Sequence, residues 1–137
     1  MIYSESADNI SSEMLNGFFV GWKMFPTTEK HLELLKCSQY RIIATDDEKN
    51  IVVGFITAVS DKVLSAYIPF LEVLPLYHNK GIGSELVKRM LKLLKDYYMI
   101  DKVCDDSLQK FYEKAGLNKH NAMMIRNYEN QNGREKS

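Results

Sequence analysis

Hydrophobic residues in the middle of the chain follow patterns that predict β-strands. Runs rich in Val, Ile, Tyr and Phe occupy residues 40–45, 50–60 and 63–73, and short polar segments separate them. Such short segments are typical of tight turns, so the three strands are expected to pair as antiparallel neighbours. Pro69 has no N–H to donate to a ladder and therefore predicts a bulge or local splaying in the third strand.

Helical periodicity is clearest in the segment that begins near Gly81. One face of this predicted helix collects the apolar residues Ile82, Leu86, Val87, Met90, Leu91 and Leu94. Two earlier segments, residues 11–24 and 27–37, are also predicted to be helical. Thr27 or Thr28 can cap the second of them.

The C-terminal third alternates between the two kinds of pattern. Residues 97–105 predict a strand, residues 107–116 a short helix ended by Gly116, and residues 121–128 a last strand. Residues 130–137 are polar and are expected to form a frayed tail. This order of elements predicts an α/β (α+β) fold in which helices cover a single sheet.

Composition excludes several classes of protein. The chain has 137 residues, 45% hydrophobic and 26% charged, which predicts one folded domain over residues 1–137 and excludes a disordered chain. Lys plus Arg and Asp plus Glu both number 18, so no bulk attraction to nucleic acid or membrane is expected. No segment is long and apolar enough to cross a membrane. The apolar residues 14–25 do not resemble a signal peptide, because acidic and polar residues come before them instead of a basic segment. A cytoplasmic location is therefore expected.

The cysteines and histidines indicate no metal site. Cys37 and Cys104 lie far apart beside apolar residues, so buried, reduced thiols are expected. His31 and His120 form no pair with ligand spacing and are expected at the surface or as helix caps.

The segment L-E-V-L-P-L-Y-H-N-K-G-I-G-S-E-L, residues 71–86, joins the third strand to the clearest helix. A helix N-terminus presents unpaired N–H groups and a partial positive charge, and both favour anions. Gly81 and Gly83 lack the Cβ atoms that would keep a ligand away from the backbone. Because Lys80 and His78 can add positive charge, this turn predicts a phosphate-binding site.

The glycine pair alone does not identify the ligand. The P-loop pattern is absent, and a dinucleotide-binding fingerprint fails because Leu86 stands where its third glycine should be. A compact strand-to-helix turn explains the two glycines about equally well. The neighbouring residues are therefore needed to decide between these interpretations.

The same segment resembles the acetyl-CoA-binding motif of the GNAT acetyltransferase superfamily. That motif reads hydrophobic-x-Pro-x-Tyr-[Arg/Gln]-x-x-Gly-x-[Gly/Ala] and precedes an amphipathic helix. The residues that match it are Val73, Pro75, Tyr77, Gly81 and Gly83. His78 departs from the motif at the Arg/Gln position, where the shorter imidazole would make weaker or pH-dependent contacts.

A second hallmark of the superfamily is similar to residues 108–117, in which an aromatic-Tyr-Glu-x-x-Gly-hydrophobic segment lies on a short helix. Asp105 stands seven residues before Tyr112, where many members carry an Asn near the pantetheine arm. The resemblance covers residues 40–128. It implies the GNAT fold, a single mixed and mostly antiparallel sheet with helices on both faces, whose fourth and fifth strands splay apart around the pantetheine.

The resemblance also implies acetyl-CoA as cosubstrate, no metal, and a diphosphate held by the N–H groups of residues 79–84. The coenzyme-binding residues that it implies are Leu71, Val73, His78, Asn79, Lys80, Gly81, Ile82, Gly83, Ser84, Asp105 and Tyr112.

The implied reaction is acetyl transfer to a primary amine of a small molecule or peptide, by direct attack in a ternary complex. Tyr112 would meet the leaving thiolate. A phenol pKa of about 10 exceeds a thiol pKa of about 8.5, so a hydrogen bond or late proton donation is expected. Glu72 or Asp101 would be the general base. Either carboxylate could instead be structural, waters could replace a single base, and Tyr112 could be a core aromatic.

Two other functions are compatible with the sequence: a non-catalytic module that senses acyl-CoA, and a protein whose glycine loop only makes a turn. The acceptor is not identified, and the chain is expected to be a monomer or a homodimer. Acceptor walls are expected from the first two helices and the last strand, with the candidates Phe18, Phe19, Trp22, Phe25 and Met124, although core packing is the commoner use of such residues.

Overall fold

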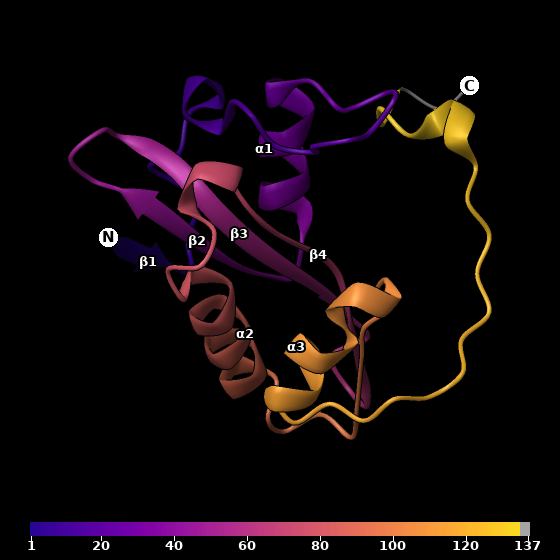
Figure 1. The fold of residues 1–137 in the computed structure, drawn as a ribbon. Coiled ribbons are helices and arrows are strands. Elements are labelled where there is room, and N and C mark those ends of the chain that lie inside the picture. Colours follow the sequence, from indigo (N-terminus) through magenta and orange to yellow (C-terminus); the bar gives the residue numbers. More distant parts are fainter. Residues whose placement is uncertain (135–137) are drawn as a thin grey trace.

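A five-stranded sheet forms the centre of the computed structural model, which describes residues 1–134 (Figure 1). The strands lie in the order β1-β2-β3-β4-β5. Neighbours are antiparallel from β1 to β4, whereas β4 and β5 are parallel. The strands are β1 (Ile2–Ser4), β2 (Tyr40–Asp46), β3 (Ile51–Ser60), β4 (Ser65–Val73) and β5 (Met99–Asp101). The three central strands are those that the sequence predicted.

β4 carries the bulge that its proline predicted. Thr57 of β3 pairs with Phe70, and the next paired residue of β3, Val59, faces Tyr67. Two residues of β4, which include Pro69, therefore stand opposite a single residue of β3, and the ladder is locally disrupted there.

The splaying of β4 and β5 follows directly from their pairing. β5 pairs only with the first three residues of β4, and the last pair joins Tyr67 to Asp101. β4 then continues for six residues to Val73 without β5 beside it. The predicted strand over residues 97–105 is thus much shorter in the structure, because its second half leaves the sheet.

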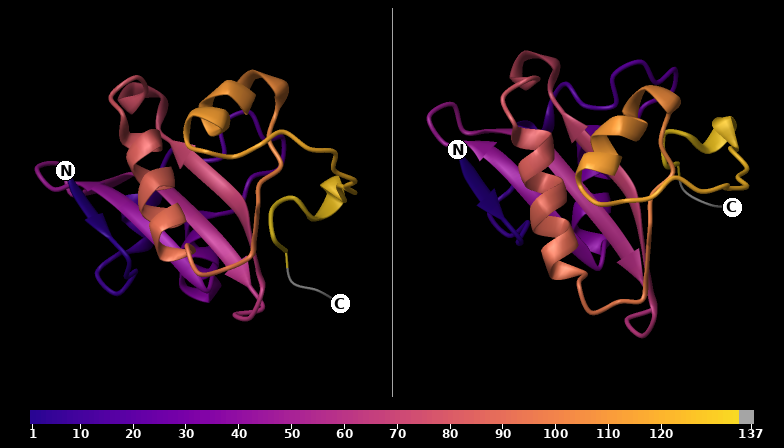
Figure 2. Two further views of the ribbon diagram at one scale, coloured as in Figure 1. Left: turned by 90° about the horizontal axis from the view of Figure 1, so that it is seen from below. Right: turned by 60° about the horizontal axis from the view of Figure 1, so that its bottom comes forward.

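Helices cover both faces of the sheet (Figures 1 and 2). α1 (Thr28–Cys37) lies on one face, and α2 (Ile82–Leu93) and α3 (Gln109–Lys114) lie on the other. Thr27 caps α1 as predicted, because its side chain accepts a hydrogen bond from the N–H of Lys30.

Two hydrophobic cores hold these layers together. The apolar stripe of α2 packs on the sheet. Ile82, Leu86, Val87 and Met90, with Leu94 just after the helix, are buried as predicted, and Leu91 is partly buried. On the other face, α1 and the N-terminal segment cover a core that includes Phe18, Phe19, Leu35, Ile43, Val52 and Phe55.

Two predicted elements are wrong. Residues 11–24 form only a short 3₁₀ turn (Ser12–Leu15) followed by a loop, in which Gly17, Phe19 and Gly21 have positive φ angles that no helix contains. Residues 121–127 are irregular and have no strand partner within the described residues, and a 3₁₀ turn (Tyr128–Asn130) follows. In Figure 1 this C-terminal segment runs along the outside of the molecule and returns toward α1.

Expectations for single residues also need correction. Cys37 is exposed, Cys104 is partly buried and both are free thiols. His31 is buried in the core, not at the surface, because it belongs to the inner face of α1. The predicted tail over residues 130–137 lies partly outside the described residues. In its described part, Arg134 Nε donates to Asn130 Oδ1 at 2.9 Å.

No helix within residues 1–134 combines the length and the apolar character that a membrane crossing requires.

Candidate functional site

The turn between β4 and α2 exposes a row of backbone N–H groups. Asn79 and Gly81 have φ angles of +62° and +81°, and Gly81 stands at the N-cap position of α2. Glycine suits this left-handed conformation, which side chains with a Cβ adopt at a cost. Within residues 1–134, none of the N–H groups from Asn79 to Ser84 donates to a protein acceptor. The amides that the sequence predicted to bind phosphate are therefore available.

Lysines stand close to this turn. The Nζ atoms of Lys49 and Lys80 lie 5.8 and 5.5 Å from the centre of the Tyr77 ring. Tyr77 is fixed by its hydroxyl, which donates to Asp46 Oδ2 at 2.7 Å, and this bond holds the pKa of Asp46 below its usual value. Tyr77, a residue of the motif, thus has two lysine ammonium groups close to its ring. These positive charges and the free N–H groups of the turn all favour an anion.

His78, the departure from the family motif, turns back toward β4. Its Nε2 atom lies 2.7 Å from the carbonyl oxygen of Val73. The side chain therefore ties the turn to the end of the strand, a contact that a guanidinium would make with different geometry.

A cavity of about 540 Å³ opens where β4 and β5 have separated. β4 contributes Leu71, Glu72 and Val73, and the segment after β5 contributes Lys102, Cys104 and Asp105. Other walls come from β3, the turn after β4, α3, the N-terminal loop and the C-terminal segment. Their residues include Phe55, His78, Tyr112, Phe19, Val20, Trp22, Met124, Arg126 and Tyr128. The cavity thus joins residues from several separate parts of the chain.

Glu72 lines this cavity and also binds the N-terminal loop. Its Oε1 accepts a hydrogen bond from the N–H of Phe19 at 2.9 Å, and its Oε2 accepts one from the N–H of Val20 at 3.3 Å. Burial raises the pKa of Glu72 above its usual value, although these two bonds and the nearby His78 act in the opposite direction. The carboxylate holds the N-terminal loop and also faces the cavity.

Tyr112 of α3 lines the same cavity and is buried. Only 5% of the residue is exposed, and burial raises the pKa of its phenol, with a further contribution from Cys104. A buried phenol with a raised pKa keeps its proton, so it can donate a hydrogen bond but is a poor source of protons.

The sequence profile of the Acetyltransferase (GNAT) family matches residues 8–117, which is most of the chain. The chain belongs to this family. Among solved structures, a candidate acetyltransferase from Deinococcus radiodurans R1 is 38% identical, with a TM-score of 0.94 over 98% of this chain and 94% of that one. A GNAT family acetyltransferase from Streptococcus pneumoniae TIGR4 is 28% identical, with a TM-score of 0.61 over 74% of this chain and 82% of that one. The predicted GNAT fold is confirmed.

A curated relative agrees with this membership over a shorter stretch. GCN5-related N-acetyltransferase 3, chloroplastic, from Arabidopsis thaliana is 39% identical over 68 residues, which are 48% of this chain and 29% of the relative. The chain therefore spans less than a third of the length of that protein. GNAT proteins use acetyl-CoA as the acetyl donor, so the turn and the cavity can be compared with the needs of that coenzyme.

The structure separates the two candidate bases of this GNAT chain. Glu72 lines the cavity, whereas Asp101 is exposed at the end of β5 and is not among the residues that line it. In β5 the exposed residues Met99 and Asp101 alternate with the partly buried Ile100, and Lys102 follows on the buried side.

Several residues beside the turn or at the cavity were not predicted from the sequence. Lys49, Lys102, Arg126 and Tyr128 come from a turn, from the end of β5 and from the C-terminal segment. Only Lys102 left a signal in the sequence, because it is a charged residue within an apolar, strand-like run. Among residues 1–134, no three His, Cys, Asp or Glu side chains gather as metal ligands would.

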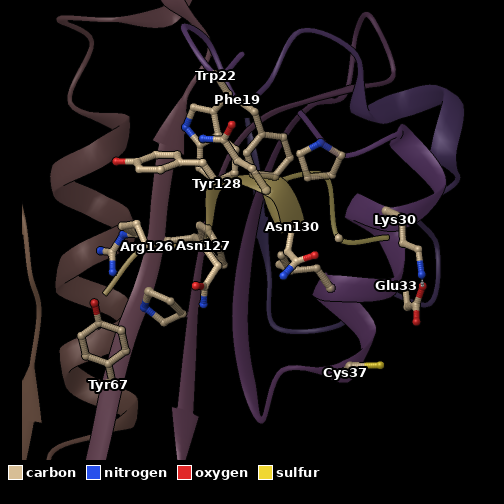
Figure 3. A pocket seen from close by; sticks show the side chains of 16 residues that line it. Phe19, Trp22, Lys30, Glu33, Cys37, Tyr67, Arg126, Asn127, Tyr128 and Asn130 are labelled. Carbon is tan, nitrogen blue, oxygen red and sulfur yellow. Dashed lines mark ion pairs between the residues drawn. The ribbon is translucent and has the colours of Figure 1, made fainter. Parts of the chain in front are cut away.

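Figure 3 shows a second cavity, of about 800 Å³, which shares part of its lining with the first. The residues that line both cavities are Phe19, Trp22, Pro69, Phe70, Arg126 and Tyr128. Aromatic side chains gather at one end of it, and Lys30 and Glu33 of α1 form an ion pair at 3.1 Å on its far wall. Of the predicted acceptor walls, Phe19, Trp22 and Met124 reach a cavity, whereas Phe18 belongs to the core and Phe25 is exposed.

Proposed function

We propose that this chain transfers the acetyl group of acetyl-CoA to a primary amine of a small molecule or peptide. The observation that carries the proposal is the row of unpaired N–H groups at Asn79–Ser84, beside a cavity that opens between two separated strands. A diphosphate would accept these N–H groups at the N-terminus of α2, next to Lys49 and Lys80. A phosphate-binding turn would not by itself need the adjoining cavity, but a nucleotide thioester needs both.

The pantetheine arm would lie along β4 like an added strand. Residues 68–73 of β4 have no β5 partner, so that side of the strand is open to an extended ligand. Leu71, Val73 and Asp105 line the cavity there and would contact the arm. The thioester would then lie between Glu72 and Tyr112.

Direct attack by a neutral amine would complete the transfer. Glu72 would take the proton of the attacking amine, directly or through a water, because its raised pKa brings it closer to the working range of a base. A backbone N–H near Val73 would polarise the thioester carbonyl. Tyr112 would donate a hydrogen bond to the departing sulfur, and its raised pKa makes full proton transfer unfavourable. Asp101 would have to act from outside the cavity.

The acceptor would occupy the second cavity. Phe19, Trp22 and Phe70 are in mutual contact there, with ring centroids 4.8 to 6.3 Å apart. Aromatic faces attract both apolar groups and cations. The walls therefore suit an amine attached to an apolar or aromatic body.

Gly81→Ala tests the coenzyme site, with Gly116→Ala as a matched control. Both glycines have positive φ angles, +81° and +105°, and a Cβ at either position meets nothing within 4 Å. Both substitutions should lower stability by about 1–2 kcal/mol, because both force a side chain into the left-handed conformation. Only Gly81→Ala should weaken acetyl-CoA binding, by about tenfold or more in calorimetry, because only its Cβ stands at the diphosphate turn.

A turnover screen then tests the chemistry. Release of free thiol from acetyl-CoA would be followed with polyamines, amino acids, aminoglycosides and peptides. Turnover with one class of amine supports the proposal. Tight acetyl-CoA binding without turnover across the panel would favour the non-catalytic sensor. If wild type and Gly81→Ala bind acetyl-CoA equally well, the turn is not part of the coenzyme site.

A further inference from the structure

Lys102 lies at the point where β4 and β5 separate. The last pair of the two strands ends at Asp101, and Lys102 is the next residue. Its Nζ donates to the carbonyl oxygen of Pro69, at the bulge of β4, with a distance of 3.3 Å. The ammonium thus bridges the two strands at the inner end of the gap between them.

The ammonium group of Lys102 also lies close to Tyr112, the residue expected to contact the sulfur of coenzyme A. Lys102 and Tyr112 both line the cavity, and Nζ lies 5.9 Å from the centre of the Tyr112 ring. Among the ion pairs of the described residues, none includes Lys102. A partly buried cation without a carboxylate partner is costly and gains from the arrival of an anion.

Acetyl transfer creates such an anion in this cavity. When the amine nitrogen bonds to the carbonyl carbon, the C–S bond breaks and its electron pair leaves on sulfur as a thiolate. Tyr112 can offer that sulfur a hydrogen bond, but it carries no charge and its pKa is raised by burial. A nearby cation would stabilise the thiolate without a proton transfer.

On the basis of the proposed function, we propose that Lys102 is a catalytic residue whose ammonium stabilises the departing thiolate of coenzyme A. The amine nitrogen forms the new C–N bond, the C–S electron pair moves to sulfur, and the proton of the amine goes to Glu72 or to water. The thiolate leaves paired with Lys102 and takes its proton from solvent after release. Lys102 keeps its own proton throughout.

The charges around Lys102 set the pH range in which it can act. Burial lowers the pKa of Lys102, Arg126 of the C-terminal segment adds to this effect, and Cys104 and Asp105 on its own segment oppose it. Glu72 of β4 and Tyr112 of α3 face the same cavity. Because a lowered pKa means that the cation is lost at a lower pH than at an exposed lysine, kcat should fall on the alkaline side as Lys102 loses its proton.

The test titrates the thiol of bound coenzyme A and requires no turnover. The ultraviolet absorbance of the thiolate would be followed against pH with saturating coenzyme A, for wild type, Lys102→Met and Lys102→Arg. A cation within a few ångströms lowers the pKa of an acid by about 1–3. The bound thiol should therefore titrate below the free coenzyme in wild type and Lys102→Arg, and at or above it in Lys102→Met. Lys110→Met, at an exposed lysine of α3, is the control and should match wild type.

Kinetics supply the second measurement. Lys102→Met should lower kcat by about 100-fold and leave the KM for acetyl-CoA nearly unchanged, and Lys102→Arg should recover most of that loss. If Lys102→Met does not fold, Lys102→Gln replaces it. An identical thiol pKa in wild type and Lys102→Met, with coenzyme bound to both, would overturn the inference. Failure of wild type to bind coenzyme A would overturn the proposed function instead, and this inference with it.

Discussion

Mild acid should destabilise this protein through a single histidine. His31 of α1 is 1% exposed, and its ring centroid lies 5.3, 4.9 and 4.5 Å from those of Phe18, Phe19 and Phe55. Within residues 1–134, neither ring nitrogen of His31 has a hydrogen-bond partner. Burial lowers the pKa of His31 from 6.5 to about 4, because the imidazolium cannot be solvated among these aromatic rings.

The magnitude follows from linkage between protonation and folding. The unfolded chain takes up a proton on His31 near pH 6.5, and the folded protein does so only near pH 4. The stability that the neutral ring contributes is therefore fully present above pH 6.5 and is lost as the pH falls toward 4. Each pH unit in that window costs about 1.4 kcal/mol, so the total loss is about 3 kcal/mol. That is a large part of the stability of an ordinary domain.

Urea unfolding as a function of pH measures this loss. His31→Phe keeps a flat ring in the aromatic cluster and removes the titrating group. Between pH 6.5 and pH 4, its free energy of unfolding should therefore fall by about 3 kcal/mol less than that of wild type. His31→Leu serves if the larger ring does not fit. His120→Phe, at an exposed histidine, should behave as wild type. Parallel losses of stability in wild type and His31→Phe would refute the reasoning, since acid would then act through other groups.

Two further predictions concern the site. Gly54→Ala places a Cβ 3.2 Å from Leu86 Cδ1 and 3.3 Å from the backbone oxygen of Glu72, so it should cost about 1–3 kcal/mol in thermal unfolding and weaken acetyl-CoA binding. An unchanged melting temperature would show that α2 can shift away from the sheet. Glu72→Gln should lower kcat by about 10²–10⁴ and remove the fall of activity that wild type shows as pH drops through the raised pKa of Glu72. Asp101→Asn should leave kcat unchanged, and the reverse outcome would make Asp101 the base.

Local signals explain why much of the fold could be predicted. The apolar stripe of α2, the cap at Thr27 and the proline of β4 each act through neighbours a few residues away. The turn proposed to bind phosphate is equally local, since Gly81 and the start of α2 together expose its N–H groups. These features need no knowledge of the rest of the chain.

The helix predicted over residues 11–24 and the strand predicted over residues 121–128 were wrong because the structure of both segments depends on residues far away in the sequence. Phe18 and Phe19 have the apolar character of a helix face, but the N–H of Phe19 is held by Glu72, which lies 53 residues away in the sequence. That bond belongs to a loop with positive φ angles and not to a helix. Residues 121–127 have the composition of a strand, but a strand also needs a neighbour, and the described sheet ends at β5.

The sequence by itself determined the order of the central elements, the glycine turn before α2 and the family, because each depends on short spacings along the chain. Only the tertiary structure decided which charged groups share the cavity. Glu72, Lys102 and Arg126 come from three separate segments, and two of these lie outside the sheet, where strand alternation no longer predicts the direction of a side chain. The chemistry of this site therefore depends on where β4 and β5 part.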